Sequence, residues 1–186
     1  LSKDLSIFYG DRCVANGISL TLNRGDRIAL VGRNGCGKSS LLKLLIGQPI
    51  AHTGTLEIGS RLTVSYVPQD MSFLSGSADD FAAESEIDIT LFKTILRKLD
   101  FKRTQFTKDM SEFSMGQKKK VLLARSLCQR ANLYIWDEPL NYIDVISRLQ
   151  IETLILEYKP TMLFVEHDEA FVNDIATKVC RISLNQ

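Results

Sequence analysis

The stretch that decides the fold is GRNGCGKSS, residues 32–40. It follows a short apolar run, IALV at 28–31, and leads into SSLLKLLIG at 39–47, where leucines recur at helical spacing. A glycine at 47 and a proline at 49 end that helix. A buried strand, a glycine-rich turn and a helix in this order predict the beginning of a parallel α/β core.

The spacing within this turn fits the pattern GxxxxGK[ST], which predicts a phosphate-binding loop. Glycines let backbone N–H groups turn inward around phosphate oxygens, and the helix N-terminus adds partial positive charge. Lys38 can reach the β- and γ-phosphates, and the Ser39 hydroxyl can bind Mg²⁺. A chance match is the alternative, which the correct strand and helix flanks disfavour. The expected nucleotide-binding residues here are Gly32, Asn34, Gly35, Cys36, Gly37, Lys38, Ser39 and Ser40.

Strands and helices alternate along the rest of the chain, after an antiparallel β part at the N-terminus. Residues 71 to about 113 change from Ser/Asp/Glu-rich to basic with helical spacing, and are expected to form a small inserted helical lobe. The expected strands are 5–9, 18–22, 28–31, 54–58, 62–67, 133–136, 162–165 and 179–184, and the expected helices are 39–46, 116–130, 144–158 and 169–176. The predicted class is α/β, with a mixed or parallel sheet core.

The composition restricts the number of domains, the partners and the compartment that are expected. With 186 residues, 45% hydrophobic, the chain is expected to form one domain. A formal net charge of +1 gives no global field for a polyanion, so a nucleic-acid partner needs a local patch. Four scattered cysteines without a CxxC pair favour a reducing compartment, the cytoplasm. No apolar run is long enough to span a membrane, and the missing initiator Met suggests a domain of a longer polypeptide.

A second motif, LYIWDEP at 133–139, ends an apolar strand with two carboxylates. Asp137 is suited to positioning Mg²⁺, and Glu138 is suited to polarising an attacking water molecule. An acidic surface turn before Pro139 is the alternative. The phosphate-binding loop elsewhere in the chain favours the catalytic interpretation.

Five further motifs occur in a fixed order: Tyr9, YVPQD at 66–70, SEFSMGQ at 111–117, LNYID at 140–144 and FVEHD at 164–168. With the first two motifs, they make the whole chain resemble an ATP-binding cassette (ABC) ATPase domain. The resemblance implies that Tyr9 stacks on adenine. It implies that Gln69 and His167 act beside Glu138 in catalysis, and that Gln69 joins Ser39 and Asp137 around Mg²⁺.

The resemblance also implies that the signature, residues 114–117, caps the γ-phosphate of an ATP held by a second ABC domain. Ser114, Met115, Gly116 and Gln117 form this signature, and Asp144 corresponds to the D-loop aspartate. Met115 replaces a glycine of the family pattern, so its φ must be negative. The lysines at 118–120 fall in the first turn of the following helix, where they indicate either an anionic neighbour or a solvated face.

The sequence EPLNYID is similar to the corresponding motif of the ABC-F branch, and most similar to that of the C-terminal cassette of its antibiotic-resistance members. This implies ATP-gated ribosome binding that protects ribosomes from drugs, with a second cassette in the same polypeptide. The basic residues Lys93, Arg97, Lys98, Lys102, Arg103 and Lys108 are the candidate rRNA-facing surface, with a solvated helix face as the alternative. An ATPase subunit of a membrane transporter and a nucleotide sensor without turnover remain open, and a DNA-repair cassette ranks last.

Overall fold

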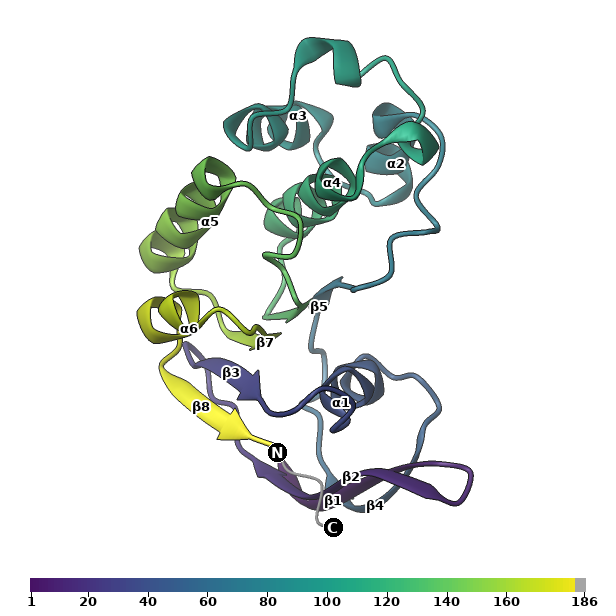
Figure 1. The fold of residues 1–186 in the computed structure, drawn as a ribbon, viewed down its shortest axis with the longest axis vertical. Coiled ribbons are helices and arrows are strands. Elements are labelled where there is room, and N and C mark those ends of the chain that lie inside the picture. The colour runs from purple at the N-terminus through teal and green to yellow at the C-terminus, as the bar shows by residue number, and fades with distance from the viewer. Residues whose placement is uncertain (183–186) are drawn as a thin grey trace. The chain divides into compact units, whose positions relative to one another are not determined.

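The chain divides into two units in this computed structural model, which describes residues 1–182. The first, here called the sheet unit, comprises Leu1–Tyr66, Ala131–Asp137 and the chain from Lys159 onward. The second, here called the helical unit, comprises Val67–Arg130 and Glu138–Tyr158. Each unit is described by itself (Figure 1).

The N-terminal part of the sheet unit is an antiparallel sheet with the strand order β2-β1-β4. Its strands are β1 (Ser2–Tyr9), β2 (Arg12–Leu20) and β4 (Ala51–Leu56). The predicted antiparallel beginning is therefore confirmed, although β2 starts earlier than expected. The reason is the tight turn at Gly10, whose φ is 56°, because it lets Arg12 pair directly with Tyr9.

The second sheet of this unit is five-stranded, in the order β5-β6-β7-β3-β8. The pairs β3–β7, β3–β8 and β6–β7 are parallel, and Ile28 of β3 lies opposite Leu163 of β7. The predicted residues 183–184 of the last strand lie outside the described part of the chain. The elements are β3 (Arg27–Val31), α1 (Lys38–Leu45), β5 (Val64–Val67), β6 (Leu133–Asp137), β7 (Met162–Val165), α6 (Glu169–Ile175) and β8 (Lys178–Arg181).

Continuous apolar strands explain why this sheet is buried. Leu30, Ile135, Leu163 and Val165 are each at most 1% exposed, and they belong to one cluster with Leu41 and others of α1. Strands of a parallel sheet covered on both faces need such unbroken apolar runs. The predicted α/β class with an antiparallel N-terminal part is confirmed.

The helical unit contains α2 (Ala78–Glu84), α3 (Ile89–Lys98), α4 (Met115–Cys128) and α5 (Val145–Tyr158), with two short 3₁₀ turns at Arg103–Gln105 and Met110–Glu112. Helix starts follow local capping chemistry: the side chains of Ser77 and Asp88 accept hydrogen bonds from N–H groups in α2 and α3. Residues 71–113 contain α2, α3 and both 3₁₀ turns, joined by turns and irregular segments.

Helix α4 is buried over most of its middle part. Leu122 and Leu123 are fully buried besides Val121 and Ala124, whereas Leu127 and Cys128, nearer its C-terminal end, are only half-buried. Within residues 1–182, no helix is both long and apolar enough to cross a membrane.

Candidate nucleotide site

The glycine-rich turn between β3 and α1 is built so tightly that two of its glycines cannot be replaced without strain. Gly37, at the N-cap of α1, has φ 86°, and a Cβ there would lie 2.6 Å from Ala15 Cβ. A Cβ on Gly32 would lie 2.4 Å from the Ile182 carbonyl oxygen. The backbone thus forms a cradle that only glycine allows, as a phosphate-binding loop requires.

Lys38 is the only charged side chain of this turn that is buried, at 6% exposure. Its Nζ donates to the carbonyl oxygens of Gly32 at 2.8 Å and Arg33 at 3.1 Å, so the ammonium group lies across the loop. A lysine ammonium has three protons to donate. The half-buried Ser39 follows in the first turn of α1. A buried ammonium group and a hydroxyl at the N-terminus of a helix make a donor set that fits a polyphosphate and its Mg²⁺.

The carboxyl ends of three neighbouring parallel strands bring further predicted residues to the edge that carries this turn. The strand order β6-β7-β3 puts Asp137 at the end of β6, and Glu166 and His167 directly after β7. Asp137 is only 1% exposed. Burial raises the pKa of Tyr66 to about 12, and the Asp137 charge adds to the rise. The Asp137 carboxylate therefore has the place and the charge to bind a metal ion beside phosphate.

Glu166 of the FVEHD motif directly precedes His167. In the structure Glu166 is 5% exposed, and its carboxylate accepts hydrogen bonds from the backbone N–H groups of His167, at 2.7 Å, and Asp168, at 3.4 Å. It therefore fixes the loop that carries the exposed His167. Tyr9, at the end of β1, is 49% exposed, and its ring surface is accessible as stacking on a base requires.

In the helical unit, Gln69 and Glu138 meet as the resemblance implies. Glu138 Oε2 accepts hydrogen bonds from Gln69 Nε2 at 2.8 Å and from Asn141 Nδ2 at 2.5 Å. Glu138 has φ 49°, a left-handed conformation that costs a non-glycine residue about 1–3 kcal/mol. The sequence analysis missed Asn141, although it lies inside the quoted LNYID motif three residues after Glu138. Its position in the turn that follows Glu138, shortly after Pro139 in the sequence, was the available signal.

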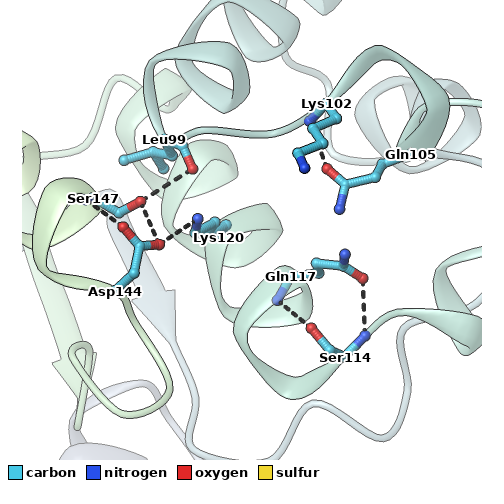
Figure 2. Close-up of polar contacts among 8 residues, drawn as sticks. All are labelled: Leu99, Lys102, Gln105, Ser114, Gln117, Lys120, Asp144 and Ser147. Carbon is cyan, nitrogen blue, oxygen red and sulfur yellow. Dashed lines mark hydrogen bonds and ion pairs between the residues drawn. The ribbon is translucent and has the colours of Figure 1, made fainter.

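The signature residues begin helix α4 with a reciprocal cap. Ser114 Oγ accepts from the Gln117 N–H at 3.3 Å, and Gln117 Oε1 accepts from the Ser114 N–H at 3.0 Å (Figure 2). Met115 lies in the first turn with the negative φ of a helix, and its side chain is 46% exposed. Gly116 is required by close approach, because a Cβ there would lie 2.5 Å from the Tyr142 carbonyl oxygen. A methionine at 115 is therefore accommodated without backbone strain.

Two lysines of the run 118–120 are buried, so the solvated face is wrong for Lys119 and Lys120, whereas an anionic neighbour is confirmed for Lys120. Lys119 is 1% exposed, and its Nζ donates to the Pro68 carbonyl oxygen at 3.2 Å. Lys120 is also buried, and its Nζ lies 2.6 Å from Asp144 Oδ2 (Figure 2). The run instead ties the signature helix to the segment before Gln69 and to the D-loop aspartate.

Asp144 is the centre of this network. It accepts from the Ser147 backbone N–H at 2.9 Å, and the Ser147 hydroxyl lies 2.9 Å from Asp144 Oδ2 and 3.1 Å from the Leu99 carbonyl oxygen (Figure 2). Burial alone raises the pKa of Asp144, but the hydrogen bonds from Lys120 and Ser147 outweigh it and lower the pKa to about 2. Asp144 is therefore ionised at neutral pH.

The predicted rRNA-facing residues differ in their partners. Lys93 is neutralised by Asp79 at 2.6 Å and lies 5.9 Å from the centre of the Phe106 ring. The remaining cations are exposed, and none has an ion-pair partner among residues 1–182: Arg97, Lys98, Lys102, Arg103 and Lys108.

Comparison with known proteins shows which family and which relatives this chain is similar to. The family model described as "ABC transporter" matches residues 15–141. A protein of Bacillus subtilis with the name "Putative ATP-binding protein YdiF" is 36% identical over 97% of this chain and 29% of its own length. ABC transporter F family member 2 of Arabidopsis thaliana is 30% identical over 97% of this chain and 27% of its own length. The chain thus spans less than a third of the length of these relatives.

Two solved structures share the fold. The ATP-binding subunit of an ABC transporter superposes with a TM-score of 0.82 at 21% identity, covering 98% of this chain and 87% of the other. An archaeal ribosome recycling factor, solved in complex with a ribosomal stalk protein, gives 0.75 at 24% identity, covering 100% and 37%. At these identities the likeness concerns the fold alone.

Proposed function

Because this chain belongs to the ABC family, whose domains bind and hydrolyse ATP with Mg²⁺ and pair around it, we propose that it is one cassette of a two-cassette ATPase of the ABC-F type. The observation that carries the proposal is the glycine cradle closed by the buried Lys38, on the same sheet edge as the buried Asp137. We further propose that residues 71–113 are the inserted lobe of this single domain, and that the second cassette is in the same polypeptide.

Different residues contact the phosphates, the adenine and the metal ion of Mg·ATP. Turn amides and Lys38 hold the β- and γ-phosphates, and the Tyr9 ring lies against adenine. The Ser39 hydroxyl, the Asp137 carboxylate and the Gln69 amide oxygen would hold Mg²⁺, which when bound neutralises phosphate charge. Lys38 exchanges its contacts with the Gly32 and Arg33 carbonyl oxygens for contacts with phosphate oxygens, so the cradle needs little rearrangement.

Glu138 is the proposed general base for the attacking water. Its carboxylate is oriented by Gln69 and Asn141, so that one oxygen is held by amide donors. His167, in the loop fixed by Glu166, is the second proposed catalytic residue, and its proposed role is to donate a hydrogen bond to the γ-phosphate. Both roles need the γ-phosphate to be enclosed before water attacks.

Enclosure comes from the partner cassette. Ser114, Gly116 and the N-terminus of α4 supply hydrogen-bond donors and partial positive charge to an ATP held by the other cassette. Asp144, ionised and fixed by Lys120, keeps the D-loop in one conformation against α4. A single cassette therefore binds Mg·ATP but turns it over slowly.

We propose that the complete protein is cytoplasmic, binds ribosomes when ATP closes its two cassettes, and protects ribosomes from antibiotics. The resemblance to the ABC-F branch implies ribosome binding, and the exposed cations from Arg97 to Lys108, which have no ion-pair partner within residues 1–182, support an RNA-facing surface in the helical unit. The second candidate function is the ATPase subunit of a membrane transporter. The description of the matching family model, "ABC transporter", favours it.

Ribosome co-sedimentation tests this proposal. The protein carrying Glu138→Gln, which traps ATP, is centrifuged with purified ribosomes with and without ATP. Pelleting that depends on ATP supports the ribosome function, and drug displacement is then measured by in vitro translation under antibiotic. ATP binding without pelleting contradicts it and favours the transporter alternative.

A further inference from the structure

A cavity lies in the sheet unit, at the opposite edge of the parallel sheet from the phosphate-binding loop. Its volume is about 680 Å³, in the range that holds nucleotide-sized ligands. The segments before β3, β5, β6 and β7 form its walls, so it lies at the amino ends of four neighbouring strands. The phosphate-binding loop follows the carboxyl end of β3, about 16 Å away for five residues of strand. The cavity is therefore a separate place in the fold.

The charged groups in its lining are all cations. Arg24 comes from the segment before β3, Arg61 from the segment before β5 and Lys159 from the segment before β7. No acidic residue lines the cavity, and within the described chain none of the three cations has an ion-pair or hydrogen-bond partner for its side chain. The nearest acid in sequence, Asp26, is occupied by Lys178 at 2.7 Å. Three like charges thus face one cavity without a counter-ion, which favours an anionic ligand.

Two neutral side chains add donors to the same lining. The Thr161 hydroxyl accepts from the Gly25 N–H at 2.9 Å, and Asn132 Oδ1 accepts from the Thr63 N–H at 3.0 Å. Their acceptor atoms are therefore used, whereas the hydroxyl proton of Thr161 and the amide protons of Asn132 have no acceptor in residues 1–182. The lining consequently offers donors, and few acceptors, to a ligand.

The walls are also fixed in place by backbone hydrogen bonds. Met162 N–H donates to the Asp26 carbonyl oxygen at 2.8 Å, Tyr134 N–H to Thr161 at 3.0 Å, and Asn132 N–H to Thr63 at 2.8 Å. These bonds join all four wall segments, so the cations project from a preorganised frame. Preorganisation lowers the entropic cost of binding.

We propose that this cavity is a binding site for phosphate groups, supplied either by an RNA backbone or by a free polyphosphate. Arginine guanidinium groups match phosphate oxygens in two-pronged hydrogen bonds, and Lys159 adds a point charge. Thr161 and Asn132 donate to the remaining oxygens. The site stands on this geometry alone and is independent of the proposed ribosome function.

Charge-neutralising variants test the site. The test variant combines Arg24→Gln, Arg61→Gln and Lys159→Gln. The matched control combines Lys3→Gln, Arg12→Gln and Lys43→Gln, three exposed cations elsewhere in the same unit. Both change the formal net charge from +1 to −2, since each removes three positive charges (1 − 3 = −2). Urea unfolding midpoints equal to that of wild type show that both variants fold. If the test variant does not fold, the single substitution Arg61→Gln, in an exposed segment, replaces it.

The first arm measures anisotropy of a labelled single-stranded RNA of twelve uridines. The test variant is expected to bind this RNA about 10-fold or more weakly than wild type. The slope of log affinity against log salt concentration is expected to decrease in magnitude by about 2, because each of the three lost phosphate contacts contributes about 0.7. The control is expected to stay within about 2-fold of wild type. This result identifies an RNA backbone as the source of the phosphate.

The second arm titrates inorganic pyrophosphate by calorimetry. Wild type and control are expected to bind two equivalents, one at the phosphate-binding loop, and the test variant only one, if the source is a free polyphosphate. Equal behaviour of test and control variants in both arms overturns the proposal. Neither arm contains ribosomes, so a failure of ribosome pelleting leaves this result unaffected, and the reverse also holds.

Discussion

The ion pair between Lys120 and Asp144 provides a sharp test of how the signature helix is held to the D-loop. We expect Lys120→Met to keep the packing of the side-chain stem while removing the charge. The pKa of Asp144 falls from 3.8 to about 2 in the folded protein. That difference corresponds to about 2 kcal/mol. Because the Asp144 side chain is 46% exposed, solvent screening reduces the expected coupling with Lys120 to about 1 kcal/mol.

The pH dependence follows from the sign of this shift. The pKa of the carboxyl is depressed by folding, so its contribution to the free energy of unfolding is fully present above the unfolded pKa of about 3.8. It is lost as the pH falls through about 2. In Lys120→Met the pKa of Asp144 is expected to rise toward 3.8, with the remaining depression due to Ser147.

Two measurements check this prediction. Carbon-detected NMR titration of the Asp144 carboxyl in wild type and Lys120→Met gives the pKa directly. A double-mutant cycle with Asp144→Asn, followed by urea unfolding at pH 7, gives the coupling. An unchanged pKa together with a coupling below about 0.3 kcal/mol would refute the ion pair as the link between α4 and the D-loop.

Three further predictions follow from backbone geometry and from the composite site. Gly37→Ala must place a Cβ 2.6 Å from Ala15 at a φ of 86°, so we expect at least about 2 kcal/mol of lost stability and no measurable ATP binding; a folded variant with normal ATP affinity would contradict this. Gly116→Ala gains about 1 kcal/mol of helix propensity but meets the Tyr142 carbonyl oxygen at 2.5 Å, so we expect net destabilisation in urea unfolding, and net stabilisation would show that the contact relaxes. The ATPase rate per chain should rise with the concentration of the 186-residue chain, and a concentration-independent rate would argue against a composite site.

The parts of the fold that are encoded locally could be predicted from the sequence. The glycine-rich turn, the strand before it and the helix after it depend on residues within one short window, so spacing alone identified them. The four apolar runs of the parallel sheet were predicted for the same reason. The start of strand β2 was predicted too late in the sequence, because it depends on pairing across the Gly10 turn rather than on the apolar pattern of the strand itself.

Long-range contacts account for what the sequence could not predict. Lys119 and Lys120 look like a surface patch because their partners, the Pro68 carbonyl oxygen and Asp144, are distant in the chain. The cation-lined cavity was missed because four separate segments contribute to it and none carries a basic run. Local spacing predicts which residue types are available, whereas burial and partners arise only when the elements pack.

The most direct test of the central claim compares ATP affinity and single-turnover hydrolysis in Lys38→Ala and Glu138→Gln, with the complete protein as reference. The proposed roles predict that Lys38→Ala loses ATP binding, because the cradle loses its buried cation. They predict that Glu138→Gln binds ATP normally and hydrolyses it about 10²-fold more slowly, as expected when a positioned base is removed. Normal binding by Lys38→Ala, or wild-type turnover by Glu138→Gln, would contradict the assignment of these residues.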